Sequence, residues 1–221
     1  MWNSFIDLLV HIMSQFSAIP GFNTGLIILV TSLVFRFALL PLTIKAACSA
    51  LQKQEKLQSI QPEIEKLKKQ HKDSPEQLSR QTLELYKKHQ INLLDKKGLL
   101  SGLLQAPLFI GMISAINRIV GTGGGFLWIA DLARPDFLLT AIAAILALLA
   151  SIITPNLNEQ GKALVIWMPV ILTAVFLWKL SAGVGLYWVA SNLVNVLQSL
   201  IVRRKISNTG SINSLKLKFA Q

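Results

Sequence analysis

The feature that most constrains this chain is the gathering of its apolar residues into long runs separated by polar segments. Each run covers about 16–20 residues, the length at which a helix crosses a hydrocarbon core of roughly 30 Å. Inside that core each backbone polar group needs a partner within the protein, so runs of this length span as helices. Hydrophobic residues make up 52% of the chain. We therefore predict an all-α integral membrane protein with five transmembrane helices.

The predicted organisation follows the runs and the polar segments between them within one membrane domain. In chain order it has an amphipathic interfacial helix (1–20), a first span (24–45), a cytoplasmic antiparallel helical hairpin (46–98), a second span (99–119), an extracytoplasmic loop (120–136), a third span (137–154), a fourth span (163–179), a fifth span (183–202) and a basic cytoplasmic tail (203–221). A short polar turn, 154–162, connects the third and fourth spans.

Two polar segments carry helical periodicity. Apolar side chains recur every three or four residues from Trp2 to Phe16, and Pro20-Gly21 ends the pattern. This segment is too polar to span, so we place it in the membrane interface. Within 46–98 the same spacing appears on both sides of a turn at 73–75, which predicts two helices with a thin apolar seam. A solvated charged linker is the alternative interpretation.

The basic residues predict the orientation. Of the 22 Lys and Arg residues, twelve lie between Lys45 and Lys97 and five lie from Arg203 onward. Short loops rich in Lys and Arg stay on the cytoplasmic side. Five spans then place the N-terminus outside and the C-terminus in the cytoplasm.

Arg36 lies inside the first predicted span. An arginine at the centre of a membrane helix costs roughly 2.5–3.5 kcal/mol on insertion scales. None of the predicted spans contains an acid, because Asp131, Asp136 and Glu159 fall in loops. Snorkelling is the alternative, but the cytoplasmic end of the span lies roughly 12–13 Å away along the helix.

Polar residues at helical spacing indicate where Arg36 finds its partners. Ser32 lies one turn earlier, Gln105 lies in the second span, and Trp188, Asn192 and Asn195 share one face of the fifth. The third and fourth spans offer far less. We predict a positively charged hydrophilic pocket walled by spans one, two and five, and the alternative is that the amides only join helices.

The sequence lacks the patterns of bond-making enzymes. It has neither a His-Glu-x-x-His motif nor a Gly-x-Ser-x-Gly motif, and its three histidines are dispersed. The glycines of "GTGGGF" have no following Lys-Ser/Thr pair, and the single cysteine, Cys48, excludes an internal disulfide. We expect no enzymatic activity, no metal site and no cofactor.

Four segments in the right order resemble the YidC family of membrane protein insertases. They are "FRFALLPLTIK", "QPEIEKLKKQHKDSPEQLSRQTLELYKKHQIN", "LLQAPLFIGMISAI" and "SAGVGLYWVASNLVNVLQ". The chain departs from the family pattern after the hairpin, where it reads "INLLDKKGLLSG", and its basic tail is short. It therefore resembles a minimal or second-copy member.

The resemblance implies an insertase and chaperone of the bacterial cytoplasmic (inner) membrane. Five spans would enclose a groove open to the cytoplasm and to lipid, with the family's arginine at Arg36 and its substrate contacts at Ser32, Tyr187 and Trp188. Implied partners are nascent membrane proteins and lipids, with the ribosome and the Sec translocon as further candidates and no direct nucleic-acid function. A small anion transporter or channel and a non-catalytic assembly scaffold remain the alternative functions.

Overall fold

The computed structural model of the chain describes residues 1–221 except 72–73, 92–95, 122–123, 155–161 and 209–221. The described residues are helical, apart from loops and an isolated β-bridge between Phe126 and Ile129. The helices are α1 (Trp2–Ser17), α2 (Thr24–Ser59), α3 (Gln61–Gln70), α4 (Pro75–Lys88), α5 (Lys96–Val120), α6 (Phe137–Ile153), α7 (Lys162–Leu177) and α8 (Ala182–Asn208). Residues 155–161 of the predicted turn 154–162 and residues 209–221 of the predicted tail 203–221 lie outside the described residues.

Helix α2 is much longer than the span predicted within it. Its N-cap residue Asn23 accepts a hydrogen bond from the Leu26 N–H at 2.9 Å. The helix then continues for 36 residues, about 54 Å, and passes the predicted boundary at 45 to end at Ser59. The segment after Lys45 contains neither Gly nor Pro, so nothing local interrupts the helix where its composition turns from apolar to charged.

Helices α3 and α4 follow at the charged end of α2 and contact each other. Each begins with a proline in its first turn, where the missing N–H costs nothing. Ser74 is the N-cap of α4, but its side chain makes no capping hydrogen bond.

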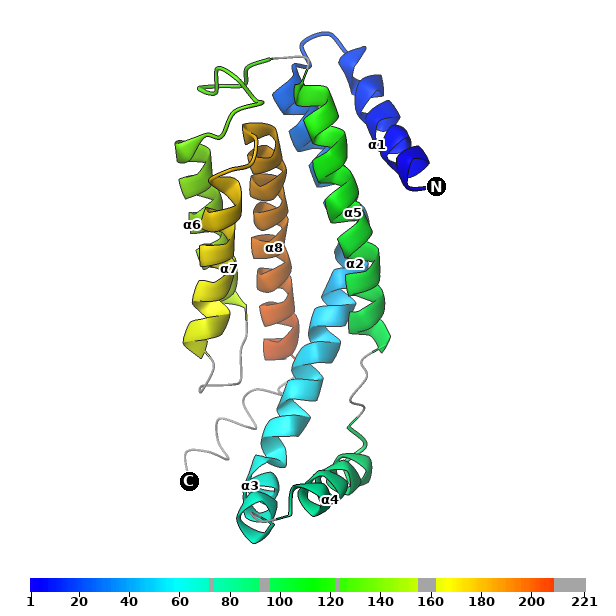
Figure 1. Ribbon diagram of the computed structural model, residues 1–221, viewed down its shortest axis with the longest axis vertical. Coiled ribbons are helices and arrows are strands. Elements are labelled where there is room, and N and C mark those ends of the chain that lie inside the picture. Colours follow the sequence, from blue (N-terminus) through cyan, green and yellow to red (C-terminus); the bar gives the residue numbers. More distant parts are fainter. Residues whose placement is uncertain (72–73, 92–95, 122–123, 155–161, 209–221) are drawn as a thin grey trace.

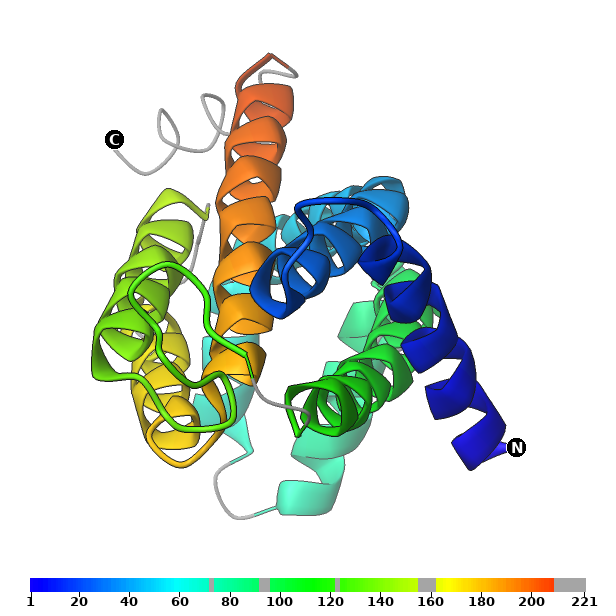
Figure 2. The same ribbon diagram turned by 90° about the horizontal axis from the view of Figure 1, so that it is seen from above.

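Helices α2, α5, α6, α7 and α8 run side by side along the long axis of the molecule (Figure 1). Helix α8 packs against α2 and α6, and α7 packs against α6. Helix α1 lies across the outside of α5 and also touches α2, at the end opposite α3 and α4 (Figure 2).

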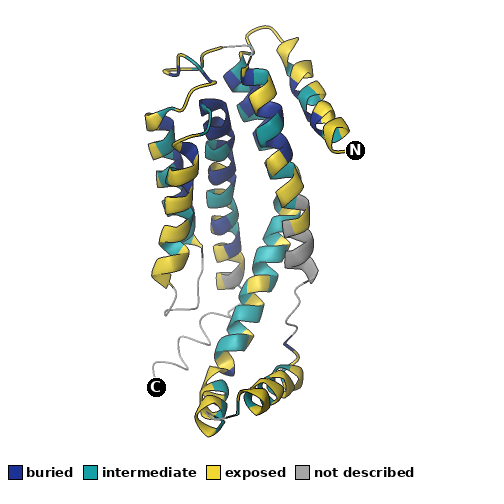
Figure 3. Ribbon diagram, in the orientation of Figure 1, coloured by how far each residue is buried: buried dark blue, intermediate teal, exposed yellow. Residues whose placement is uncertain are grey.

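The outward faces of α6 and α7 expose large apolar side chains, among them Ile145, Ile152, Ile171 and Val175 (Figure 3). An aqueous protein rarely leaves so much apolar surface uncovered. Two helices of the described chain, Thr24–Ser59 and Ala182–Lys205, are long and apolar enough to cross a membrane. Three shorter apolar helices lie at Gln105–Val120, Phe137–Ile153 and Lys162–Leu177.

The loop 124–136 packs onto the end of the bundle. Its Leu132 is fully buried, and the Leu132 carbonyl accepts a hydrogen bond from the Gly183 N–H at 3.0 Å. The Arg134 carbonyl accepts from the Ala182 N–H at 2.8 Å. These bonds satisfy free N–H groups at the start of α8. The loop therefore caps α8 while its buried side chains cover the end of the helices.

One contact fastens this loop to α2. A Cβ atom added to Gly25 would lie 2.2 Å from the Cγ atom of Phe126, so the aromatic ring occupies the space that any other residue would need. At the tip of the same loop, Leu127 has a φ of 52°. A non-glycine residue in this left-handed region costs about 1–2 kcal/mol.

Gly25→Ala should therefore displace the Phe126 ring and destabilise the protein by about 1–3 kcal/mol, the usual cost of overpacking. Thermal unfolding in detergent measures this loss. Phe126→Gly should remove the penalty of the added methyl group, because it deletes both the ring and the Phe126 Cβ atom, which would lie 2.3 Å from the added atom. The two changes should therefore not be additive. Gly121→Ala is the matched control, because its Cβ would meet atoms no closer than 3.5 Å. An additive double variant would contradict the packing described here.

Candidate functional site

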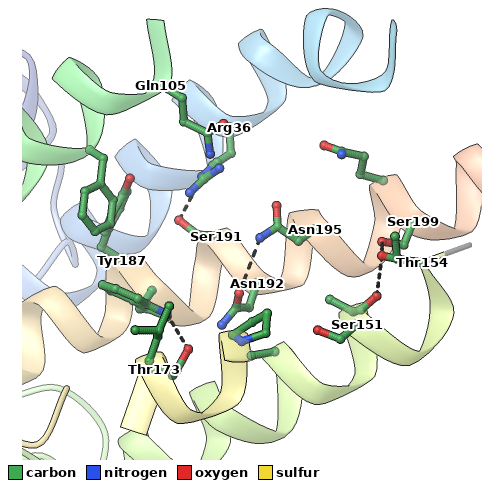
Figure 4. A pocket seen from close by; sticks show the side chains of 17 residues that line it. Arg36, Gln105, Ser151, Thr154, Thr173, Tyr187, Ser191, Asn192, Asn195 and Ser199 are labelled. Atoms are coloured by element: carbon green, nitrogen blue, oxygen red, sulfur yellow. Dashed lines mark hydrogen bonds between the residues drawn. The ribbon is translucent and has the colours of Figure 1, made fainter. Parts of the chain in front are cut away.

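A cavity of about 440 Å³ lies among α2, α5, α6, α7 and α8 (Figure 4). Arg36 is the only charged side chain among the described residues that line it. The remaining polar and amphipathic lining residues are Gln105, Ser151, Thr154, Thr173, Tyr187, Trp188, Ser191, Asn192, Asn195, Gln198 and Ser199. The helices thus line a partly open polar cavity with one cation among its described lining residues.

Arg36 points from α2 toward α8. Its Nε–H donates to the Ser191 Oγ atom at 2.9 Å, and its Cζ atom lies 5.9 Å from the centre of the Tyr187 ring. No carboxylate lies within ion-pair distance of Arg36 in the described part of the chain. A guanidinium has five N–H donors, so its terminal nitrogens remain able to bind water or an anionic group. This geometry differs from snorkelling, since the side chain crosses to a neighbouring helix.

One face of α8 supplies most of the polar wall. The residues recur every three or four positions, so their side chains form a row along the helix (Figure 4). The Asn192 amide donates to the Ala143 carbonyl of α6 at 3.1 Å, and the Asn195 amide contacts the Asn192 Oδ1 atom at 3.5 Å. Further along, the hydroxyls of Thr154 and Ser199 are 2.7 Å apart. The polar wall therefore also holds α6 against α8.

Aromatic residues narrow the cavity at the end nearer the 124–136 loop. The Trp188 Nε1–H donates to the Thr173 Oγ1 atom of α7 at 3.0 Å. The Phe109 ring of α5 lies 5.3 Å from the Trp188 ring and 5.8 Å from the Tyr187 ring. The indole thus contacts side chains from both neighbouring helices and has a fixed orientation.

Six of the seven side chains predicted from the sequence line this cavity: Arg36, Gln105, Tyr187, Trp188, Asn192 and Asn195. Ser32 does not. It is completely buried, and its hydroxyl donates to the Ile28 carbonyl of its own helix. Ser32 and Arg36 are four residues apart, which exceeds one full helical turn by about 40°, so the two side chains do not point in the same direction. A short serine side chain therefore stays in the helix packing, whereas the long arginine reaches the cavity.

Helices α6 and α7 contribute more to the lining than the sequence predicts. The walls were expected on the first, second and fifth spans, whereas Ser151, Thr154 and Thr173 bring the third and fourth into the lining. The signal was present, because Thr173 is a lone hydroxyl in an apolar run. The sequence does not show which residue faces Thr173, and in the structure that residue is Trp188 on another helix.

Helices α5 and α7 both border the cavity but do not pack against each other in the described part of the chain. Gln105 and Phe109 come from α5, and Pro169, Leu172 and Thr173 come from α7. Both views place α7 to the left of α8 and α5 to its right (Figures 1 and 2). Between α5 and α7 the cavity is therefore bounded by side chains and not by a helix–helix contact.

Known proteins resemble this chain over most of its length. Residues 15–209 match the family model described as "60Kd inner membrane protein". The chain is 30% identical to "Membrane protein insertase YidC" of Clostridium tetani, over 91% of this chain and 93% of that protein. It is 34% identical to "Membrane protein insertase YidC 2" of Bacillus anthracis, over 92% of this chain and 81% of that protein. The YidC of Aliivibrio salmonicida is 30% identical, but the match spans 38% of its length.

A solved structure is also similar. It is described as "Active YidC insertase crystal structure with the first transmembrane domain resolved". The TM-score is 0.60 and the identity 26%, over 88% of this chain and 45% of that one.

The contact between Trp188 and Thr173 can be tested by a double-mutant cycle. Trp188→Phe and Thr173→Val each remove one partner of the hydrogen bond, so their effects on unfolding should overlap by about 0.5–1.5 kcal/mol, the net value of such a bond. Thermal unfolding in detergent is the measurement. Ser114→Ala, which removes a hydroxyl bonded only within α5, should combine additively with Trp188→Phe. Strict additivity for both pairs would contradict the contact.

Proposed function

The chain belongs to the 60Kd inner membrane protein family, that of the YidC membrane protein insertases, and we propose that its polar cavity is the route by which it inserts nascent proteins. The relatives reported above are all named as insertases, which favours this function over an anion transporter or an assembly scaffold. The substrates of such a protein are newly made membrane proteins, and the chain acts in the bacterial inner membrane.

We propose that α2, α5, α6, α7 and α8 each span the bilayer, with the boundaries predicted from the sequence. The exposed apolar faces of α6 and α7 support this topology, as do the basic residues gathered on α3, α4 and the charged end of α2. The N-terminus then lies outside and the C-terminus inside. Helix α1 lies in the outer interface, and α3 and α4 form the cytoplasmic hairpin.

The proposed mechanism depends on Arg36, the one charged side chain among the described residues that line the cavity. A guanidinium enclosed by low-dielectric helices attracts an acidic group more strongly than one in water. Arg36 has no carboxylate partner among the described residues, so an acidic residue of an incoming segment fills that role transiently. The amides and hydroxyls along α8 form hydrogen bonds with the backbone of the incoming segment and so replace part of its hydration shell.

The apolar part of the substrate leaves toward lipid between α5 and α7. The described residues of these helices do not pack against each other, and the apolar side chains of Phe109 and Leu172 border the cavity there. Partitioning of the substrate helix into hydrocarbon supplies the driving force, together with the membrane potential acting on its charges. The step requires no nucleotide.

We propose the basic hairpin of α3 and α4 as the surface that receives the nascent chain. Its first-turn acids and last-turn lysines suit exposed helices in the cytoplasm. The ribosome and the Sec translocon are the partners proposed for this surface.

Substitutions at Arg36 test the role of charge. In cells depleted of their own insertase, Arg36→Ala should slow insertion roughly ten- to hundredfold, the equivalent of about 1.5–3 kcal/mol for a charge-assisted hydrogen bond. Arg36→Lys should restore much of the rate, and Arg36→Gln should not. Membrane insertion of a pulse-labelled substrate with an acidic translocated tail is the measurement. Equal rescue by lysine and glutamine would show that polarity suffices and would overturn the role of charge.

Photocrosslinking tests the proposed path. A photoreactive residue at Gln105 or Leu172, on opposite sides of the α5–α7 boundary, should capture a stalled nascent membrane protein. Ile145 is the matched control, because it is exposed on α6 but does not line the cavity. Capture only at Ile145 would overturn the proposed route.

A further inference from the structure

The tip of the loop 124–136 displays two large apolar residues. Phe126 and Ile129 exchange backbone hydrogen bonds of 2.8 and 2.9 Å, so Leu127 and Trp128 form a two-residue turn between them. Such turns favour Gly, Asn or Asp, which tolerate a positive φ. Here the residue at φ 52° is a leucine that is 75% exposed, followed by a tryptophan that is 48% exposed. The exposed Leu127 side chain thus adds nothing to the apolar core of the folded chain.

The residues flanking the tip determine its direction. The Phe126 ring packs against Gly25 of α2, and Ile129 and Leu132 are buried. The Trp128 Nε1–H donates to the Asp136 carboxylate at 3.3 Å, and the same carboxylate caps α6 through the Leu139 N–H at 2.7 Å. The inner side of the turn is thus anchored to α2 and its outer side to the start of α6, which leaves Leu127 pointing away.

The apolar surface continues from this tip onto the lipid-facing helices. Phe137, next to Asp136, forms an edge-to-face pair with Trp178 at 4.4 Å, and both rings are largely exposed. Leu138 is exposed beside them, and exposed Lys179 follows Trp178. In the view along the long axis the loop lies over α6 and α7 and not over α2 and α5 (Figure 2). Tryptophan and lysine side by side are characteristic of the membrane–water interface.

We propose that Leu127 and Trp128 insert into the interfacial region of the outer leaflet and anchor the loop there. This inference rests on the membrane topology proposed above. Helices of 17 and 16 residues, α6 and α7, measure only about 24–26 Å, so a hydrocarbon core of about 30 Å extends beyond their ends. The tip adds apolar surface beyond the adjoining ends of these helices. A lipid surface also fits an indole that is partly exposed yet hydrogen-bonded at its polar edge.

A fluorescent probe can test the depth of the tip. With Cys48→Ser, which removes the single cysteine, the full chain carries one new cysteine at Leu127, Ala133 or Leu138, each labelled with a nitrobenzoxadiazole dye. Ala133 is an exposed residue of the same loop beyond the tip, and Leu138 is exposed on α6. The proteins are reconstituted in vesicles of phosphatidylethanolamine and phosphatidylglycerol that contain a shallow or a deep spin-labelled phosphatidylcholine.

At Leu127 we expect blue-shifted emission, stronger quenching by the shallow than by the deep spin label, and protection from aqueous iodide relative to Ala133. This pattern corresponds to a depth of about 5–10 Å, typical of interfacial anchors. The dye and the loop are the same at both positions, so the comparison removes any affinity of the dye for lipid.

If Leu127 matches Ala133 in iodide access while Leu138 is quenched by lipid, the anchor is overturned and the topology stands. If Leu138 also escapes lipid quenching, the proposed topology fails and the anchor fails with it. If the Leu127 dye is protected but insensitive to both spin labels, the tip is covered by protein, which also overturns the proposal.

Discussion

The guanidinium of Arg36 determines which polar groups the helices around it must supply. A permanent cation cannot lie in hydrocarbon without solvation, and its bond to Ser191 makes α8 its immediate partner. The polar row along α8 then serves two purposes at once. Ser191 binds the guanidinium, while Asn192 and Ser199 of the same row bond to α6 and line the cavity. The polar side chains along α8 therefore line the cavity and also hold α6 against α8.

The two ends of the bundle differ in how they are closed. At one end the loop 124–136 supplies carbonyl groups to the start of α8 and places Leu132 in the core. Toward the other end the cavity is lined by small hydroxyl and amide side chains, and the described parts of α5 and α7 do not contact each other. A tightly packed end and an open polar side are consistent with the proposed insertion route, in which a chain enters without opening a pore across the membrane.

The loop 124–136 packs against the bundle on one side and displays apolar residues on the other. Phe126 packs inward against Gly25, whereas Leu127 and Trp128 face outward above α6. The Asp136 carboxylate connects the tip to α6, because it caps that helix and also accepts a hydrogen bond from the Trp128 indole. An anchored tip would hold the closed end of the bundle at a constant depth, and the short helices α6 and α7 would then remain aligned with the hydrocarbon core.

The sequence alone determined the helices and the polar character of the site, because periodicity, apolar runs and the lack of acids near Arg36 are local properties. Six of the seven predicted side chains line the cavity for that reason. It did not determine which side of each helix faces inward. Ser32 is buried in the packing and bonds within its own helix, whereas Thr173 lines the cavity and accepts a hydrogen bond from Trp188 of α8. The Arg36–Ser191 bond joins residues 155 positions apart. Only the tertiary structure decides such contacts, because helix rotation depends on how side chains from several helices fill a shared space.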